Sequence, residues 1–135
     1  MKFKIRVLLF VVLAVLLFSA ISSAQDNTTR LRPPARATGF IGGESHDSYL
    51  VHGRKGQRLT VRLSWRRHHD KILGDNNAEF WVGDLPDFDA AGEVKFGNKF
   101  DNGKAWTGRL PKTGDYFIYI TAHPSARYTL RVTFN

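Results

Sequence analysis

The sequence contains no cysteine. Disulfide bonds, which stabilise many small exported domains, are therefore excluded, and so is the lipid-carrying cysteine that follows the signal peptide of a bacterial lipoprotein. A thiol nucleophile is excluded for the same reason. A hydrophobic core must hold the fold together without covalent cross-links.

A membrane-spanning run is missing too. The longest apolar run, residues 7–18, is shorter than the about 20 residues that a spanning helix needs. Basic residues precede this run, and the small residues Ser22, Ser23 and Ala24 follow it, as in a cleavable secretory signal peptide. We predict that residues 1–24 are a signal peptide and that the mature protein is periplasmic or secreted, with no membrane anchor. A retained anchor is the alternative.

Acidic side chains are in the minority. Cleavage after Ala24 removes Lys2, Lys4 and Arg6, which leaves 17 of the 20 Lys and Arg side chains against all 12 Asp and Glu side chains, a net charge of +5. This excess favours an acidic partner or surface. The 111 remaining residues of the 135 are enough for one domain with one core.

Helical periodicity is absent from the mature chain. Residues 25–36 are polar, include Pro33 and Pro34, and show no periodicity, so we predict a flexible N-terminal arm there. From residue 37 to 135 apolar and polar residues alternate in short runs between glycine-rich turns. In residues 57–65 Leu59 and Val61 share one face and Arg58 and Arg62 share the other. The pattern predicts an all-β fold: an antiparallel, jelly-roll-like β-sandwich of seven or eight short strands.

The expected strands and loops can be placed along the chain. Strands are predicted at residues 38–42, 48–52, 57–65, 78–82, 94–96, 105–110 and 115–121, followed by a last strand whose core face carries Tyr128, Leu130, Val132 and Phe134. Trp106 is predicted to point inward. Residues 66–77 and 83–92 are predicted to be a polar loop and an acidic loop, and residues 122–126 a short loop before the last strand.

Several short motifs carry a resemblance to a known family. They are Thr38-Gly39, Asp47-Ser48-Tyr49, Lys55-Gly56-Gln57, Gly108-Arg109-Leu110-Pro111, Thr113-Gly114-Asp115-Tyr116 and Tyr128-Thr129-Leu130-Arg131-Val132. In this order they resemble the bacterial pre-peptidase C-terminal domain, and within that group the chain is similar to the small periplasmic inhibitors of g-type lysozyme. The resemblance implies a β-sandwich without enzymatic activity and a protein partner, g-type lysozyme.

The chain departs from the resembled inhibitors in one loop. In those inhibitors the loop between the last two strands is longer and rich in Arg and Lys, and a tyrosine precedes the first strand. Here the loop, residues 122–127, has Arg127 as its single basic residue, and Ala37 stands before Thr38. The family's contact residues therefore cannot be transferred directly.

The sequence shows no motif of a known catalytic or cofactor site. It lacks a glycine elbow around a serine, a phosphate-binding loop and a His-Glu-x-x-His pair, so we predict no enzymatic activity and no cofactor. For His68-His69-Asp70 a solvated loop is favoured over a metal site, and for the acidic residues of 84–93 a solvated loop is favoured over calcium. Export argues against nucleic acid as a partner.

The candidate binding residues are basic or polar side chains near two of the loops. They are His123, Ser125, Arg127, Arg66 and Arg67. A guanidinium group inserted into a lysozyme cleft can pair with the acidic catalytic residue there. Alternatively, these arginines keep an exposed sheet face soluble. The leading hypothesis is an exported inhibitor of g-type lysozyme that inserts a loop into the cleft. The alternatives are a stand-alone pre-peptidase-type module that binds polysaccharide, an envelope component or another protein, and an enzyme with an unrecognised site.

Overall fold

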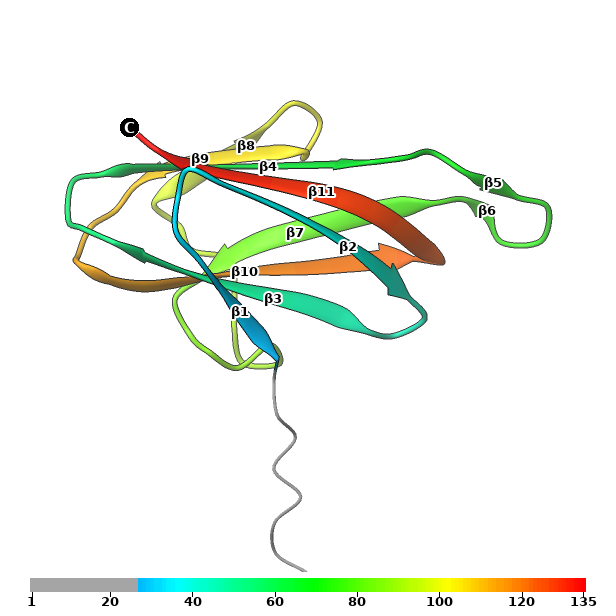
Figure 1. The fold of residues 1–135 in the computed structure, drawn as a ribbon, viewed down its shortest axis with the longest axis horizontal. Helices are drawn as coiled ribbons and strands as arrows, with labels where there is room; N and C mark the ends of the chain where they lie inside the picture. Colours follow the sequence, from blue (N-terminus) through cyan, green and yellow to red (C-terminus); the bar gives the residue numbers. More distant parts are fainter. Residues whose placement is uncertain (1–26) are drawn as a thin grey trace, which may run out of the picture.

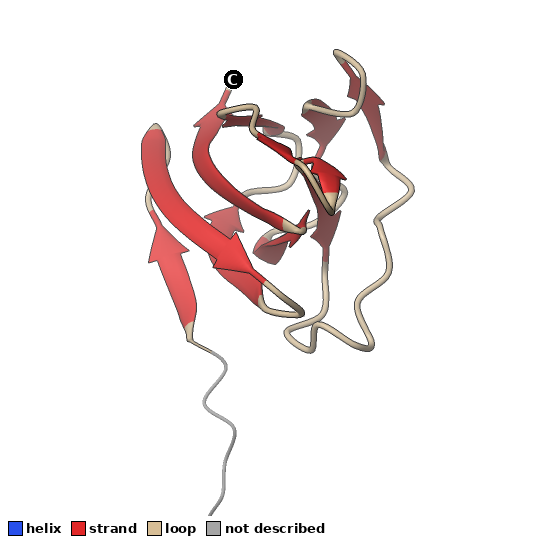
Figure 2. Cartoon of the chain, turned by 90° about the vertical axis from the view of Figure 1, so that its right-hand side faces the viewer, coloured by secondary structure: helices blue, strands red, loops and turns tan. Residues whose placement is uncertain are grey.

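The computed structural model describes residues 27–135, in which all the regular structure is β-strand. Two sheets pack face to face, as Figures 1 and 2 show. The strands are β1 (Thr28–Leu31), β2 (Ala35–Gly42), β3 (His46–Gly53), β4 (Arg58–Trp65), β5 (His69–Asp70), β6 (Gly74–Asp75), β7 (Asn77–Gly83), β8 (Gly97–Phe100), β9 (Ala105–Arg109), β10 (Gly114–His123) and β11 (Ser125–Phe134). The predicted all-β sandwich is confirmed. The predicted signal peptide lies outside the described residues.

Each sheet combines strands from distant parts of the sequence. The first sheet has the order β1-β3-β10-β7, and the second has the order β2-β11-β4-β9-β8. All pairs in these sheets are antiparallel except β1 with β3, which is parallel. The strands β5 and β6 pair only with each other, in a hairpin that extends beyond the sandwich (Figure 1).

The prediction of a flexible arm over residues 25–36 is wrong for most of that segment. Thr28–Leu31 forms β1 along the edge of β3, Leu31 packs against the core, and β2 already begins at Ala35. A short parallel edge strand receives its stability from a distant partner, so it leaves no local alternation in the sequence.

The number of strands and the place of one of them also differ from expectation. Eleven strands form within residues 27–135 instead of seven or eight, and the strand expected at residues 94–96 lies instead at Gly97–Phe100. Val94 and Phe96 pack against the core, and the ring of Phe96 makes edge-on contacts with Trp106 and Tyr116. The N–H of Val94 donates to the carbonyl of Val82 in β7 at 2.9 Å, but this segment does not form a strand. Burial of these two side chains produced the strand-like pattern.

The expected loop at residues 122–127 is nearly absent. β10 continues to His123 and β11 begins at Ser125, so Pro124 alone separates a strand of the first sheet from a strand of the second. The backbone N–H of Gly43 donates to the carbonyl of Pro124 at 3.2 Å. The chain crosses between sheets at this point, and no long loop is available for insertion into a partner.

The core lies between the two sheets and is rich in aromatic side chains. Trp106 is fully buried, as predicted, and its indole ring lies against two glycines. A Cβ atom on Gly97 or Gly108 would lie 2.1 or 2.5 Å from ring atoms of Trp106. These two positions must therefore be glycine for the indole to fit.

A buried polar contact joins the two sheets. The hydroxyl groups of Tyr49 on β3 and Tyr128 on β11 are 2.6 Å apart, and Tyr128 donates to the carboxylate of Asp47. Burial raises the pKa of both tyrosines, and at Tyr128 the hydrogen bonds to Asp47 and Tyr49 raise the pKa further. Both tyrosines are therefore neutral donors at physiological pH.

No helix within residues 27–135 is long and apolar enough to cross a membrane.

Candidate functional site

Asn76 joins the two segments that carry the candidate binding residues. Its side-chain amide donates to the carbonyl of Arg66 at 3.0 Å and to the carbonyl of Ser125 at 3.3 Å, and its side-chain oxygen accepts from the N–H of His68 at 2.7 Å. The N–H of Arg66 also donates to the carbonyl of Arg127 at 3.4 Å. Residues about sixty positions apart therefore lie together at one end of the sandwich, which we call the basic end (residues 66–67 and 123–127).

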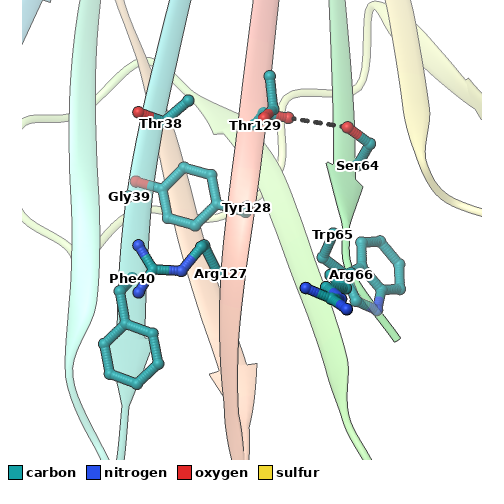
Figure 3. Close-up of a pocket in the computed structure, with 9 residues that line it drawn as sticks. All are labelled: Thr38, Gly39, Phe40, Ser64, Trp65, Arg66, Arg127, Tyr128 and Thr129. Carbon is teal, nitrogen blue, oxygen red and sulfur yellow. Dashed lines mark hydrogen bonds between the residues drawn. The ribbon is translucent and has the colours of Figure 1, made fainter. Parts of the chain in front are cut away.

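Arg66 and Arg127 line one hollow on the outer face of the second sheet, with a volume of about 490 Å³ (Figure 3). Arg127 extends toward β2, where its guanidinium carbon lies 5.8 Å from the centroid of the Phe40 ring. Arg66 lies beside Trp65 at the end of β4. The hollow is lined by Thr38, Gly39, Phe40, Ser64, Trp65, Arg66, Arg127, Tyr128 and Thr129.

The other three candidates lie close by but outside this hollow. His123 is exposed at the end of β10, paired in register with Asn77 of β7. Ser125 is half-buried beside Gly42 of β2. Arg67 lines a neighbouring hollow of about 550 Å³ at the base of the projecting hairpin. The five residues thus share one end of the molecule but form no single pocket.

The projecting hairpin, residues 66–77, contains the segment that was expected to be a polar loop. His69 and Asp75 face each other across it, with Nδ1 of His69 and Oδ1 of Asp75 2.8 Å apart. At the tip, the carboxylate of Asp70 accepts from the N–H groups of Ile72 and Leu73, and these bonds lower the pKa of Asp70. The loop expectation is therefore wrong: these residues form an ordered hairpin.

Two exposed apolar side chains occupy the tip of this hairpin. Ile72 is 92% exposed and Leu73 is 56% exposed. Phe40, beside Arg127, is 60% exposed. None of these three side chains was predicted from the sequence to be part of the site. The signal available for Ile72 and Leu73 was an apolar pair between Asp70 and Gly74, two residue types that favour turns.

The charge at the basic end is not neutralised within the chain. None of Arg66, Arg67 and Arg127 lies within 4.0 Å of a carboxylate oxygen in the described residues. Their guanidinium groups are exposed and keep their donors available. Residues 27–135 contain no group of three or more His, Asp or Glu side chains that could hold a metal ion.

The fold is similar to that of several solved structures. The chain superimposes on a periplasmic inhibitor of g-type lysozyme, PliG, from Aeromonas hydrophila with a TM-score of 0.61 and 20% identity, over 80% of this chain and 96% of the inhibitor. The corresponding values for PliG from Salmonella Typhimurium are 0.54 and 17%, over 80% and 98%. The chain has the fold of these inhibitors. No protein-family model and no curated protein sequence matches it.

The same fold also occurs in a protein with another role. CorA, a surface-associated copper-binding protein of Methylomicrobium album, superimposes with a TM-score of 0.55 and 10% identity, over 80% of this chain and 98% of CorA. A shared sandwich therefore does not assign a function. The function must be argued from the side chains that this chain presents.

Proposed function

We propose that this chain is an exported, non-enzymatic binding protein that inhibits g-type lysozyme and acts in the periplasm or outside the cell. The observation that carries the proposal is the basic end. Within residues 27–135, Arg66, Arg67 and Arg127 have no carboxylate partner. Arg66 and Arg67 begin the projecting hairpin, and Arg127 is joined to Arg66 by a backbone hydrogen bond. The fold shared with PliG supports the same target.

The proposed contact is electrostatic at its centre. A lysozyme cleft contains an acidic catalytic residue, and a guanidinium group can bind a carboxylate with two parallel hydrogen bonds. Arg127 lies against Phe40, which limits the directions in which its side chain can point. A hydrogen bond to a charged group contributes about 1.5–3 kcal/mol, so one well-placed pair is enough to affect inhibition strongly.

The element that enters the cleft is proposed to be the projecting hairpin. Loop insertion through residues 122–127 is no longer available, because Pro124 alone connects the two strands there. The hairpin extends beyond both sheets from the same end of the molecule, and its tip carries Ile72 and Leu73. In this arrangement His123, Ser125 and Arg67 contact the rim of the cleft and Arg127 contacts its acidic wall.

A cell-wall lysis assay tests the proposal. Purified mature protein is added to g-type lysozyme, with c-type and i-type lysozymes in parallel, and the fall in turbidity is followed. We expect selective inhibition of the g-type enzyme, at least tenfold weaker for Arg127→Ala. Lys112→Ala is the matched control because Lys112 is exposed and precedes β10, at the opposite end of that strand from His123.

Two results would contradict the proposal. Absence of inhibition by a folded sample in molar excess excludes the target. Equal losses for Arg127→Ala and Lys112→Ala exclude the basic end as the contact surface. The alternative function is a binding module for a polysaccharide or an envelope component. It is favoured by the exposed arginines on the outer face of strands β2, β11, β4 and β9.

A further inference from the structure

The register of the second sheet places arginines directly opposite one another on neighbouring strands. Arg131 on β11, the second strand of this sheet, lies opposite Arg36 of β2 and opposite Arg62 of β4. Arg58 of β4 lies opposite Arg109 of β9. All five side chains are exposed on the outer side of the sheet, and we call this surface the arginine face.

Hydroxyl side chains form one row between the two arginine rows and a second row beyond Arg36-Arg131-Arg62, on the side of the basic end. Thr129 lies opposite Thr38 and Ser64, and Thr60 lies opposite Thr107 and Thr133. The hydroxyl oxygens of Thr60 and Thr107 are 3.2 Å apart. Because side chains on one face recur every second residue, the two arginine rows are about 13 Å apart along the strands, and the row that contains Thr60 separates them.

The arrangement is electrostatically unfavourable without a ligand. Neighbouring strands are about 4.8 Å apart, and like charges placed directly opposite each other destabilise a sheet. The row Arg36-Arg131-Arg62 has one nearby carboxylate in the described residues, Asp101, at 3.9 Å from Arg62. Both of those side chains are more than half exposed, so solvent screens the pair.

Two of the arginines have contacts that hold them in place. Arg62 lies over the ring of Phe100, 5.0 Å from its centroid, and Arg109 donates to the carbonyl of Gly56 at 2.8 Å. These contacts orient the side chains but do not neutralise them. An anion bound from outside the chain would neutralise the remaining charge and relieve the repulsion.

We propose that the arginine face binds an anionic polysaccharide, lying across rows of guanidinium and hydroxyl groups. Guanidinium groups pair with the carboxylate or sulfate groups of such a chain, and the threonines can hydrogen-bond its sugar hydroxyls. The inference does not rest on lysozyme inhibition, because its five arginines lie outside the basic end. The row of Thr38, Thr129 and Ser64 borders the hollow that Arg66 and Arg127 line.

The chemistry of this face favours a glycan over other polyanions. Proteins that bind single-stranded nucleic acid stack its bases on aromatic side chains, whereas the arginine and threonine rows here have none between them. Binding in a membrane interface needs inserted apolar side chains. The exposed aromatics of the second sheet, Phe40 and Phe100, lie at the margins of the face, on β2 and on the edge strand β8.

The test measures affinity for defined polymers. Fluorescently labelled polygalacturonate and dextran sulfate carry carboxylate and sulfate groups, and neutral dextran is the uncharged reference. The variant Arg36→Gln/Arg62→Gln/Arg131→Gln changes only exposed positions. Arg30→Gln/Arg54→Gln/Lys112→Gln is the matched control, because it removes the same charge from exposed sites outside the face.

We expect the native protein to bind at least one anionic glycan but not neutral dextran. The arginine-face variant should lose at least tenfold in affinity and the control variant less than threefold. Equal losses for the two variants, or no binding to either anionic glycan, would overturn the proposal. It would also be overturned by tighter, face-dependent binding to single-stranded DNA or to phosphatidylglycerol vesicles.

The same variants separate this proposal from lysozyme inhibition. The arginine-face variant should still inhibit g-type lysozyme, because Arg66, Arg67 and Arg127 are unchanged. Arg127→Ala should retain glycan binding within about threefold. If the arginine-face variant loses inhibition but glycan binding is absent throughout, the arginines belong to the lysozyme contact and no separate glycan site exists.

Discussion

The outer faces of the two sheets are built in opposite ways. On the first sheet, Trp81 of β7 and Phe117 and Tyr119 of β10 point outward. Phe88, from the connection between β7 and β8, packs on Trp81 and Tyr119, and Phe117 stacks on Tyr119. On the second sheet, arginine and threonine side chains point outward with no part of residues 27–135 folded over them. One face is closed by the chain itself, and the other is open within residues 27–135.

The connection between β7 and β8 also carries several acidic side chains, apart from the arginines of the second sheet. Asp84, Asp87 and Asp89 lie in it, whereas the arginine face belongs to the second sheet. Glu93, at the end of the connection, pairs with Lys99 of β8 at 3.4 Å. The net positive charge is therefore much more concentrated on one face than the total suggests. A polarised surface of this kind steers an anionic partner toward the second sheet.

The largest expected difference between the two faces is in stability. Tyr119 is fully buried under Phe88, between Trp81 and Phe117, and its hydroxyl donates to the carbonyl of Leu85. Tyr119→Ala should lower the free energy of unfolding by about 3–5 kcal/mol, because it removes an aromatic ring from a packed site. Urea denaturation followed by circular dichroism measures this change.

The conservative variant separates packing from hydrogen bonding at the same position. Tyr119→Phe keeps the ring and should lose only about 1 kcal/mol. A loss for Tyr119→Ala as small as that expected for an exposed residue would show that the connection does not close the first sheet.

A second prediction concerns the contact that joins the two sheets. Tyr128→Phe leaves the partly buried carboxylate of Asp47 without its donor, at an expected cost of about 1–3 kcal/mol at pH 7. A second substitution at Gly39 of β2 cannot fill the space left by the hydroxyl group, because a Cβ atom there would also collide with ring atoms of residue 128.

The pH dependence of this variant has a defined sign. In the folded protein the pKa of Tyr128 is raised above its ordinary value of 10.0, so the tyrosine stays protonated while the unfolded chain ionises. Its contribution is fully present below pH 10 and is lost above it, with a slope of about 1.4 kcal/mol per pH unit. Between pH 8 and 11 the free energy of unfolding should fall less steeply for Tyr128→Phe than for the native protein. Parallel curves would contradict the assignment of Tyr128 as a buried neutral donor.

The sequence could predict the sandwich because its main signal is local. In β4 the buried Leu59, Val61 and Leu63 alternate with the exposed Arg58 and Arg62, and any half-buried strand shows this period. The change of sheet at Pro124 and the parallel pairing of β1 have no local period. They depend on partners that are distant in sequence.

The candidate site was predictable only in its residue types. Arg66 and Arg127 were identified by their charge, but their meeting depends on the register of β4 with β11 and on Asn76, which no pattern singles out. The alternation of β4 placed Arg58 and Arg62 on one face. The rows that they form with Arg36, Arg131 and Arg109 appear only when the strand order is known.

The smallest expected effect tests whether the open face is strained by its own charge. Arg131 has two arginines directly opposite it, whereas Arg58 has one. Arg131→Gln should therefore raise the free energy of unfolding by about 0.2–1 kcal/mol at low ionic strength, and Arg58→Gln by less. Added salt at 0.5 M should remove both gains, because it screens exposed charges at these distances. A loss of stability for Arg131→Gln would mean that its aliphatic stem covers the sheet and outweighs the repulsion, so that the face needs no anion to be stable.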